Sequence, residues 1–176
     1  SVMLDIINSI LVPSHIYERI WSYHYFNMQN DLDIESMAKI TDIIPDHVSS
    51  KDVIVIGMSP SPRKLNKKPY SNSTLVRLSR WMKDVNQPEW SFHNVIPNVV
   101  GSSSMQDVDV SALLKAVNGK KTIIALGTFV ERVCKKHNID SFKIDHPSPR
   151  NRNFNDPTYE SKMLNSLKTF LQSKYN

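Results

Sequence analysis

Four consecutive β-branched residues, Val53-Ile54-Val55-Ile56, are followed directly by Gly57. In a sheet with one solvated face, apolar and polar residues would alternate along the strand. An unbroken apolar run instead predicts a strand buried on both faces, as strands of parallel sheets are. The run therefore favours an α/β fold, in which helices flank a central parallel sheet.

Strand-like and helix-like segments alternate along the rest of the chain. Further strands are predicted at 90–96, 122–126 and 142–145. Apolar residues at helical spacing predict helices at 71–83, 109–117, 130–137 and 159–174. This order predicts a four-stranded parallel sheet with right-handed crossovers.

The 176 residues favour a single domain, residues 1–176. Within it, residues 1–50 form a predicted helical N-terminal segment, since Ile6, Ile7, Ile10 and Leu11 recur at helical spacing. Residues 51–176 form the predicted α/β core.

The single cysteine, Cys134, allows neither an internal disulfide nor a four-cysteine metal site. We therefore expect an intracellular monomer without metal or cofactor. No apolar run approaches the roughly 20 residues that span a bilayer, and no signal peptide is expected at the start. The net charge of +5 is compatible with a polyanionic partner.

Ligands of parallel sheets bind beyond the carboxyl ends of the strands. Here that rule points to four turns, at 57–62, 94–98, 127–129 and 146–152. The first contains Gly57 and two prolines, which suits a rigid, exposed turn that holds a water or a base near backbone amides. A plain strand-to-loop turn with a solvated basic tail is the alternative interpretation.

Two further turns carry polar side chains suited to a ligand. In the second, His146-Pro147-Ser148-Pro149, prolines fix the backbone around a histidine that can donate a hydrogen bond near neutral pH. In the third, the Asn94 amide can donate and accept together, as the edge of a pyrimidine requires. Structural roles for His146 and Asn94 are the alternatives.

These segments, in this order, resemble the motifs of the uracil-DNA glycosylase superfamily. Gly57-Met58-Ser59-Pro60 resembles the water-activating motif, most closely in the single-strand-selective branch, and Pro69-Tyr70 resembles the pair whose aromatic ring stacks on the flipped base. Asn94 lies where the base-reading asparagine is expected. His146-Pro147-Ser148-Pro149 is identical to the start of the second family motif. The resemblance covers roughly residues 50–174.

The chain departs from the family pattern at two positions. Ser59 stands where most branches carry an acid or amide, although one active branch carries a nonpolar residue there. Arg150 stands in place of the leucine that wedges into the duplex. An arginine fills that gap only partly, or holds a phosphate.

The resemblance implies a DNA glycosylase that flips a uracil or modified pyrimidine and hydrolyses its glycosidic bond. It implies catalytic roles for His146 and Ser59. It implies base contacts by Gly57, Met58, Pro60, Tyr70 and Asn94, and DNA contacts by Arg63, Lys64, Lys67, Lys68, Ser148, Arg150 and Arg152.

Three alternatives remain at this stage. The same fold could recognise or process a modified base without ordinary hydrolysis, because Ser59 is not an acid. The chain could be an inactive module that binds DNA or a protein. It could also be another nucleotide-binding α/β protein, although it contains no glycine-rich phosphate loop.

Overall fold

The computed structural model describes residues 44, 47–60, 73–98 and 104–175. These residues contain a sheet of four strands in the order β2-β1-β3-β4, and every pairing is parallel. The strands are β1 (Val53–Gly57), β2 (Ser91–Asn94), β3 (Thr122–Leu126) and β4 (Phe142–Ile144). The predicted α/β domain with a four-stranded parallel sheet is thereby confirmed.

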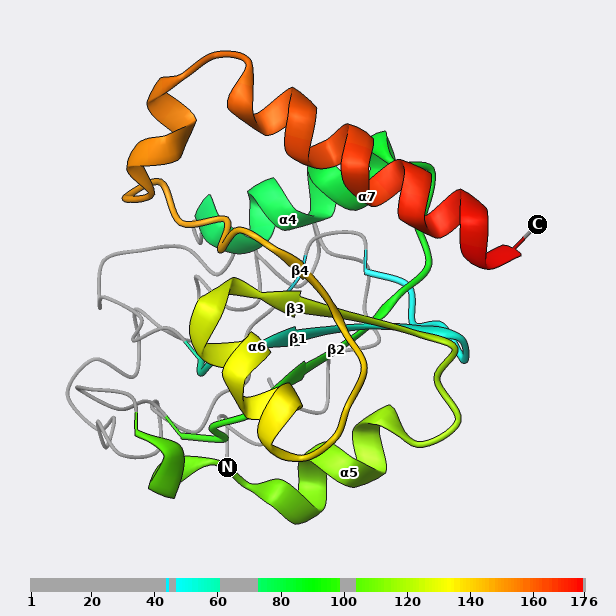
Figure 1. Cartoon of the computed structure of the whole chain (residues 1–176), viewed down its shortest axis with the longest axis vertical. Helices are drawn as coiled ribbons and strands as arrows, with labels where there is room; N and C mark the ends of the chain where they lie inside the picture. The colour runs from blue at the N-terminus through cyan, green and yellow to red at the C-terminus, as the bar shows by residue number, and fades with distance from the viewer. Residues whose placement is uncertain (1–43, 45–46, 61–72, 99–103, 176) are drawn as a thin grey trace, which may run out of the picture.

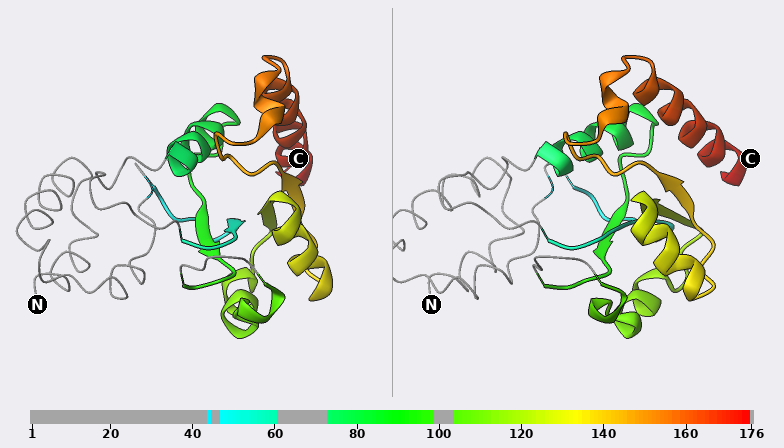
Figure 2. Two further views of the ribbon diagram at one scale, coloured as in Figure 1. Left: turned by 90° about the vertical axis from the view of Figure 1, so that its left-hand side faces the viewer. Right: turned by 60° about the vertical axis from the view of Figure 1, so that its left-hand side comes forward.

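Helices cover both faces of this sheet (Figures 1 and 2). One face carries α4 (Ser73–Asp84) and α7 (Tyr159–Tyr175), and the other carries α5 (Val110–Val117) and α6 (Gly127–Lys136). Two short 3-10 helices, η3 (Met105–Asp107) and η4 (Arg152–Asn155), lie in the connections.

The connections change face when they change direction. The step from β1 to β2 passes through α4, whereas the steps to β3 and β4, on the other side of β1, pass through α5 and α6. Crossovers between parallel strands are right-handed, so connections that run in opposite directions across the sheet must place their helices on opposite faces. The strand order therefore has its switch point between β1 and β3.

Strand β1 is buried along its whole length, as its β-branched run predicts. Alternate side chains enter two separate clusters. Val53 and Val55 pack with residues of α4 and α7, including Trp81 and Leu167. Ile54 and Ile56 pack with residues of α5 and α6, including Leu113, Val130 and Val133. The central strand thus joins both halves of the core.

Several predicted boundaries differ from the observed ones, most by a single residue, and three of these differences have a structural cause. β2 ends at Asn94 rather than at 96, because the N–H groups of Val95 and Ile96 turn to the carbonyls of Gly57 and Met58, at 3.0 and 2.8 Å. Helix α6 begins at Gly127 rather than at 130. The φ of +84° at Gly127 allows a sharp turn out of β3 directly into the helix.

The third error concerns the end of β4. This strand ends at Ile144 rather than at Asp145, because its partner in the last register pair, Leu126, is the final residue of β3 and the chain then turns into α6. The two 3-10 helices were not predicted. The predicted N-terminal helices lie outside the described residues. Of the segment 1–50, the structure describes residues 44 and 47–50, which are not helical, and Val48 forms an isolated parallel bridge with Glu89.

Candidate functional site

The candidate site lies at the carboxyl edge of the sheet, around the switch point between β1 and β3. Gly57 is the last residue of β1, and Gly127 follows the last residue of β3. Ligands of open α/β sheets bind in the crevice at this position. Two of the predicted side chains, Asn94 and His146, approach these two glycines.

Asn94 packs directly over Gly57. The two residues are register partners at the ends of β2 and β1. A Cβ atom built on Gly57 would lie 2.6 Å from Asn94 Oδ1 and 2.7 Å from Phe92 Cζ. No real side chain could occupy that space unless both neighbours moved. Gly57 is therefore required for the position of the Asn94 amide, and the structure brings the first and third predicted segments together.

The turn after Gly57 is held on both sides of Ser59. The Met58 side chain packs against the cluster that contains Leu113, and the Met58 carbonyl accepts the N–H of Ile96 at 2.8 Å. Pro60 is buried, whereas Ser59 is half-buried. The backbone on both sides of Ser59 is therefore anchored in the fold, although the turn is less exposed than predicted, and the second proline of the motif, Pro62, lies outside the described residues.

His146 lies beside the other glycine of the edge. A Cβ atom built on Gly127 would lie 3.5 Å from His146 Cβ, so the start of α6 and the turn after β4 are in contact. The imidazole is half-buried, and this burial lowers the pKa of His146 below its ordinary value of 6.5. Burial therefore favours the neutral form of the ring.

One hydrogen bond determines which nitrogen of His146 carries the proton. The backbone N–H of Ser148 donates to His146 Nδ1 at 3.1 Å. A backbone N–H can only donate, so Nδ1 must offer its lone pair, and the proton of the neutral ring must be on Nε2. The turn therefore presents His146 as a neutral hydrogen-bond donor through Nε2.

The rest of this turn leads into η4. The Ser148 hydroxyl accepts the N–H of Arg150 at 3.2 Å, and the Asn151 side chain caps η4 by accepting the N–H of Asn153 at 3.1 Å. Arg150 and Arg152 are both exposed. Two guanidinium groups in the segment that follows His146 are therefore exposed to a polyanion.

The sequence interpretation missed Asp145, which immediately precedes His146. Its carboxylate accepts hydrogen bonds from Asn151 Nδ2 at 2.9 Å, from Asn153 Nδ2 at 3.1 Å and from the Tyr159 hydroxyl at 3.0 Å. Partial burial raises the pKa of Asp145, but these three donors and the charge of Lys143 together outweigh that effect and lower the pKa overall. The only signal in the sequence is an acid followed by several amide side chains, and many loops share that pattern.

His93 precedes Asn94 but belongs to the other face of the sheet. Burial lowers the pKa of His93, and the charge of Asp109, which caps α5, partly opposes this effect. Nε2 of His93 is buried and makes no hydrogen bond to any described residue. His93 therefore packs on the α5 side, away from Asn94 and Gly57.

Five of the predicted site residues lie outside the described residues, so the structure does not test them. They are Arg63, Lys64, Lys67, Lys68 and Tyr70. Within the described part of the chain, no three His, Cys, Asp or Glu side chains are grouped as a metal site would require.

Comparison with known proteins identifies no relative. No protein-family model matches the sequence, and no curated protein is significantly similar to it. A search of the described helices finds none that is long and apolar enough to cross a membrane. The function must therefore be argued from the residues of the site.

Proposed function

We propose that this protein is a DNA glycosylase with a uracil-DNA glycosylase-like fold. It flips a uracil or a modified pyrimidine out of DNA and hydrolyses the N-glycosidic bond. The observation that carries this proposal is the hydrogen bond from the Ser148 N–H to His146 Nδ1, which leaves Nε2 as the donor of a half-buried imidazole at the carboxyl edge of the sheet.

Breaking the glycosidic bond leaves negative charge on the departing pyrimidine, mainly on its carbonyl oxygens. A fixed N–H donor aimed at such an oxygen stabilises the transition state more than the ground state. His146 suits this task because Ser148 holds its Nδ1 as an acceptor and leaves Nε2–H for the base. Its lowered pKa means that this donor carries no positive charge.

Recognition of the base is assigned to Asn94, with Tyr70 as the stacking ring. An amide both donates and accepts, and this matches the alternating N–H and C=O groups of a pyrimidine edge. Packing over Gly57 holds the Asn94 amide at the end of β1. The cost of unstacking the base, a few kcal/mol, is offset by these contacts.

Hydrolysis needs one water molecule. Its oxygen bonds to C1′ of the sugar as the bond from C1′ to the base nitrogen breaks, and the electron pair of that bond leaves with the base. The water loses one proton, and the base gains one. The Ser59 hydroxyl, with the backbone around Met58 and Pro60, would orient this water. Serine orients a water without acting as a carboxylate base.

Binding of the DNA backbone is assigned to basic and polar side chains around the two turns. These are Arg63, Lys64, Lys67, Lys68, Ser148, Arg150 and Arg152. Arg150 stands at the wedge position and could also enter the gap that the flipped base leaves. Affinity that depends on phosphates falls steeply with salt. We propose a monomer that acts in whichever intracellular compartment contains the DNA.

The test is direct. The protein is incubated with oligonucleotides that carry uracil, hydroxymethyluracil or other modified pyrimidines, in single- and double-stranded form, and alkali-labile sites are measured. The His146→Ala variant, purified in parallel, measures background cleavage by contaminating glycosylases. Abasic sites that form with the parent but not with this variant support the proposal.

A second candidate function follows from Ser59, which replaces the usual acid or amide. The protein could recognise a modified base, or process it differently, without ordinary hydrolysis. In that case the parent and the His146→Ala variant would both bind one modified oligonucleotide more tightly than its unmodified counterpart, and neither would form abasic sites.

A further inference from the structure

Three side chains donate hydrogen bonds to the carboxylate of Asp145. Asn151 and Asn153 donate to Oδ2, and the Tyr159 hydroxyl lies 3.0 Å from each oxygen. Asn153 Nδ2 also lies 3.3 Å from the Tyr159 hydroxyl, which closes the network. Three donors hold the carboxylate in place, and the lowered pKa of Asp145 makes it a weaker base. Asp145 is therefore better suited to holding its neighbours than to replacing the acid that Ser59 lacks.

The network connects β4 to two elements that follow it in sequence. Asn151 and Asn153 belong to the cap and body of η4, and Tyr159 is the first residue of α7. Asp145 directly follows β4, so it holds both elements against the end of a strand that is fixed in the sheet. The segment between these anchors is the turn that contains His146.

The other side of η4 is fixed to α4. The Phe154 ring packs edge-on against Trp81, with ring centroids 5.5 Å apart, and the Arg77 guanidinium lies 4.8 Å from the Phe154 centroid. Nη1 of Arg77 is buried and makes no hydrogen bond to a described residue, and the positive charge of Arg77 also helps to lower the pKa of Glu160. η4 is therefore held on two sides, by Asp145 and by α4.

We propose that Asp145 is the positioning residue for His146. By holding η4 and Tyr159 against the end of β4, it fixes the turn in which the Ser148 N–H meets His146 Nδ1. That hydrogen bond spans only two residues, so a small change in the backbone of the turn would break it. The tautomer and direction of the imidazole then depend on a carboxylate that contacts neither base nor water.

The expected change in the rate of base release rests on the proposed function, whereas the expected change in the His146 tautomer does not. Two variants weaken the network: Asp145→Asn, and Tyr159→Phe, which removes one hydroxyl and keeps the ring beside Phe154. In both, we expect the ¹⁵N spectrum of His146 to change from one tautomer to a mixture. Single-turnover base release should fall about 10- to 100-fold, as expected for a misplaced group, while DNA affinity is retained.

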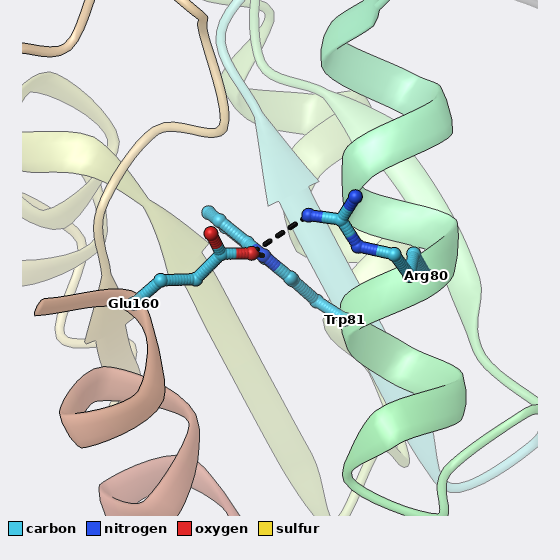
Figure 3. A network of polar contacts seen from close by, with 3 residues as sticks. All are labelled: Arg80, Trp81 and Glu160. Atoms are coloured by element: carbon cyan, nitrogen blue, oxygen red, sulfur yellow. Dashed lines mark hydrogen bonds and ion pairs between the residues drawn. The ribbon is translucent and has the colours of Figure 1, made fainter. Parts of the chain in front are cut away.

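The neighbouring residue provides the matched control. The Glu160 carboxylate accepts the Trp81 indole N–H at 2.5 Å and pairs with Arg80 at 2.8 Å, and it ties the same end of α7 to α4 (Figure 3). Glu160→Gln weakens this attachment without touching Asp145. We expect a lower melting temperature, but a single His146 tautomer and the parental rate of base release.

A reciprocal exchange tests the pairing itself. In the double variant Asp145→Asn with Asn153→Asp, a donor and an acceptor again face each other, and we expect part of the lost rate and the single tautomer to return. A single tautomer in folded Asp145→Asn and Tyr159→Phe would overturn the positioning role. If the parent releases no base, the proposed function fails, and the His146 spectrum still decides this inference.

Discussion

At the scale of single residues, the geometry around His146 defines one chemical state. The donor at Ser148 and the burial of the ring both favour the neutral form with its proton on Nε2. A positively charged imidazole would instead lose the Ser148 bond, because Nδ1 would then carry a proton as well. The backbone therefore selects a neutral donor, which suits a site that must bind a base before any charge develops.

Removing this donor should affect the chemical step more than binding. For His146→Ala, we expect base release to fall by about 10²- to 10³-fold, as is typical when one oxyanion donor is lost. The fold and most of the DNA affinity should remain, because the cavity left at a half-buried position is small. Single-turnover kinetics on a verified substrate measure this loss, and near-parental turnover would contradict the role.

Ser59 separates two kinds of glycosylase. If it marks a weakened form of ordinary uracil chemistry, then Ser59→Asp should raise uracil release, since positioned acid–base groups contribute about 10²- to 10⁴-fold. If the turn is shaped for a bulkier modified base, the larger side chain should lower activity on that base without creating uracil activity. Comparing Ser59→Asp and Ser59→Asn with the parent on both oligonucleotides distinguishes these outcomes. Activity unchanged on every base would remove Ser59 from the site.

At the scale of elements, the site depends on how two strand ends and one helix start approach each other. β1 and β2 end together at Gly57 and Asn94, and β3 passes into α6 at Gly127 beside His146. Both contacts involve glycine because a side chain would collide at the first and would be strained at the second, where φ is +84°. These junctions bring residues from separate motifs to one edge.

Gly57→Ala tests the first junction. Its new methyl group would lie 2.6 Å from Asn94 Oδ1, and overpacking of this kind costs about 1–3 kcal/mol. We expect discrimination between pyrimidines to weaken as well, because the Asn94 amide must move. Chemical unfolding and substrate profiles on matched oligonucleotides measure the two effects.

Gly119→Ala is the control for this variant. Gly119 has a φ of +76° and no atom within 4 Å of its built Cβ, so the substitution strains the backbone by about 1 kcal/mol without a collision. It should lose stability and keep the parental substrate profile. An unchanged profile in Gly57→Ala as well would show that Asn94 does not read the base.

At the scale of the whole molecule, burial of histidines makes stability depend on pH. Burial lowers the pKa values of His47, His93 and His146 below 6.5. The unfolded chain therefore binds more protons than the folded chain just below this value, and the free energy of unfolding falls as the pH falls. A further loss is expected when Asp145 and Glu160, whose pKa values are also lowered, become protonated at still lower pH.

The melting temperature should accordingly decrease between about pH 7 and pH 5.5, where the histidines but not the carboxylates titrate. His93→Gln should reduce this decrease, because burial disfavours the charged form of His93, its Nε2 makes no hydrogen bond to a described residue, and the charge of Asp109 opposes the effect only in part. Calorimetry at several pH values compares the two proteins. An equal decrease in both would mean that His93 adds nothing to the acid sensitivity.

The sequence by itself determined the class of fold and the order of its elements. The apolar run 53–56 is buried on both faces, so it requires a sheet that is covered on both sides. The later strands and helices could be predicted because the spacing of apolar residues along each segment is a local property of the chain. It also located the three turns at strand ends, since glycine, proline and the end of an apolar run are local signals.

Only the tertiary structure decided which of these turns meet and what state their side chains adopt. The strand order places Gly57 beside Asn94 and Gly127 beside His146, and no local signal encodes that order. The same holds for the Asp145 network, which joins residues up to 14 positions apart. Its aspartate, asparagine and tyrosine side chains are common in loops, so the sequence does not show that they meet. The His146 tautomer depends on the backbone N–H of Ser148, and that N–H points at Nδ1 only once the turn has folded.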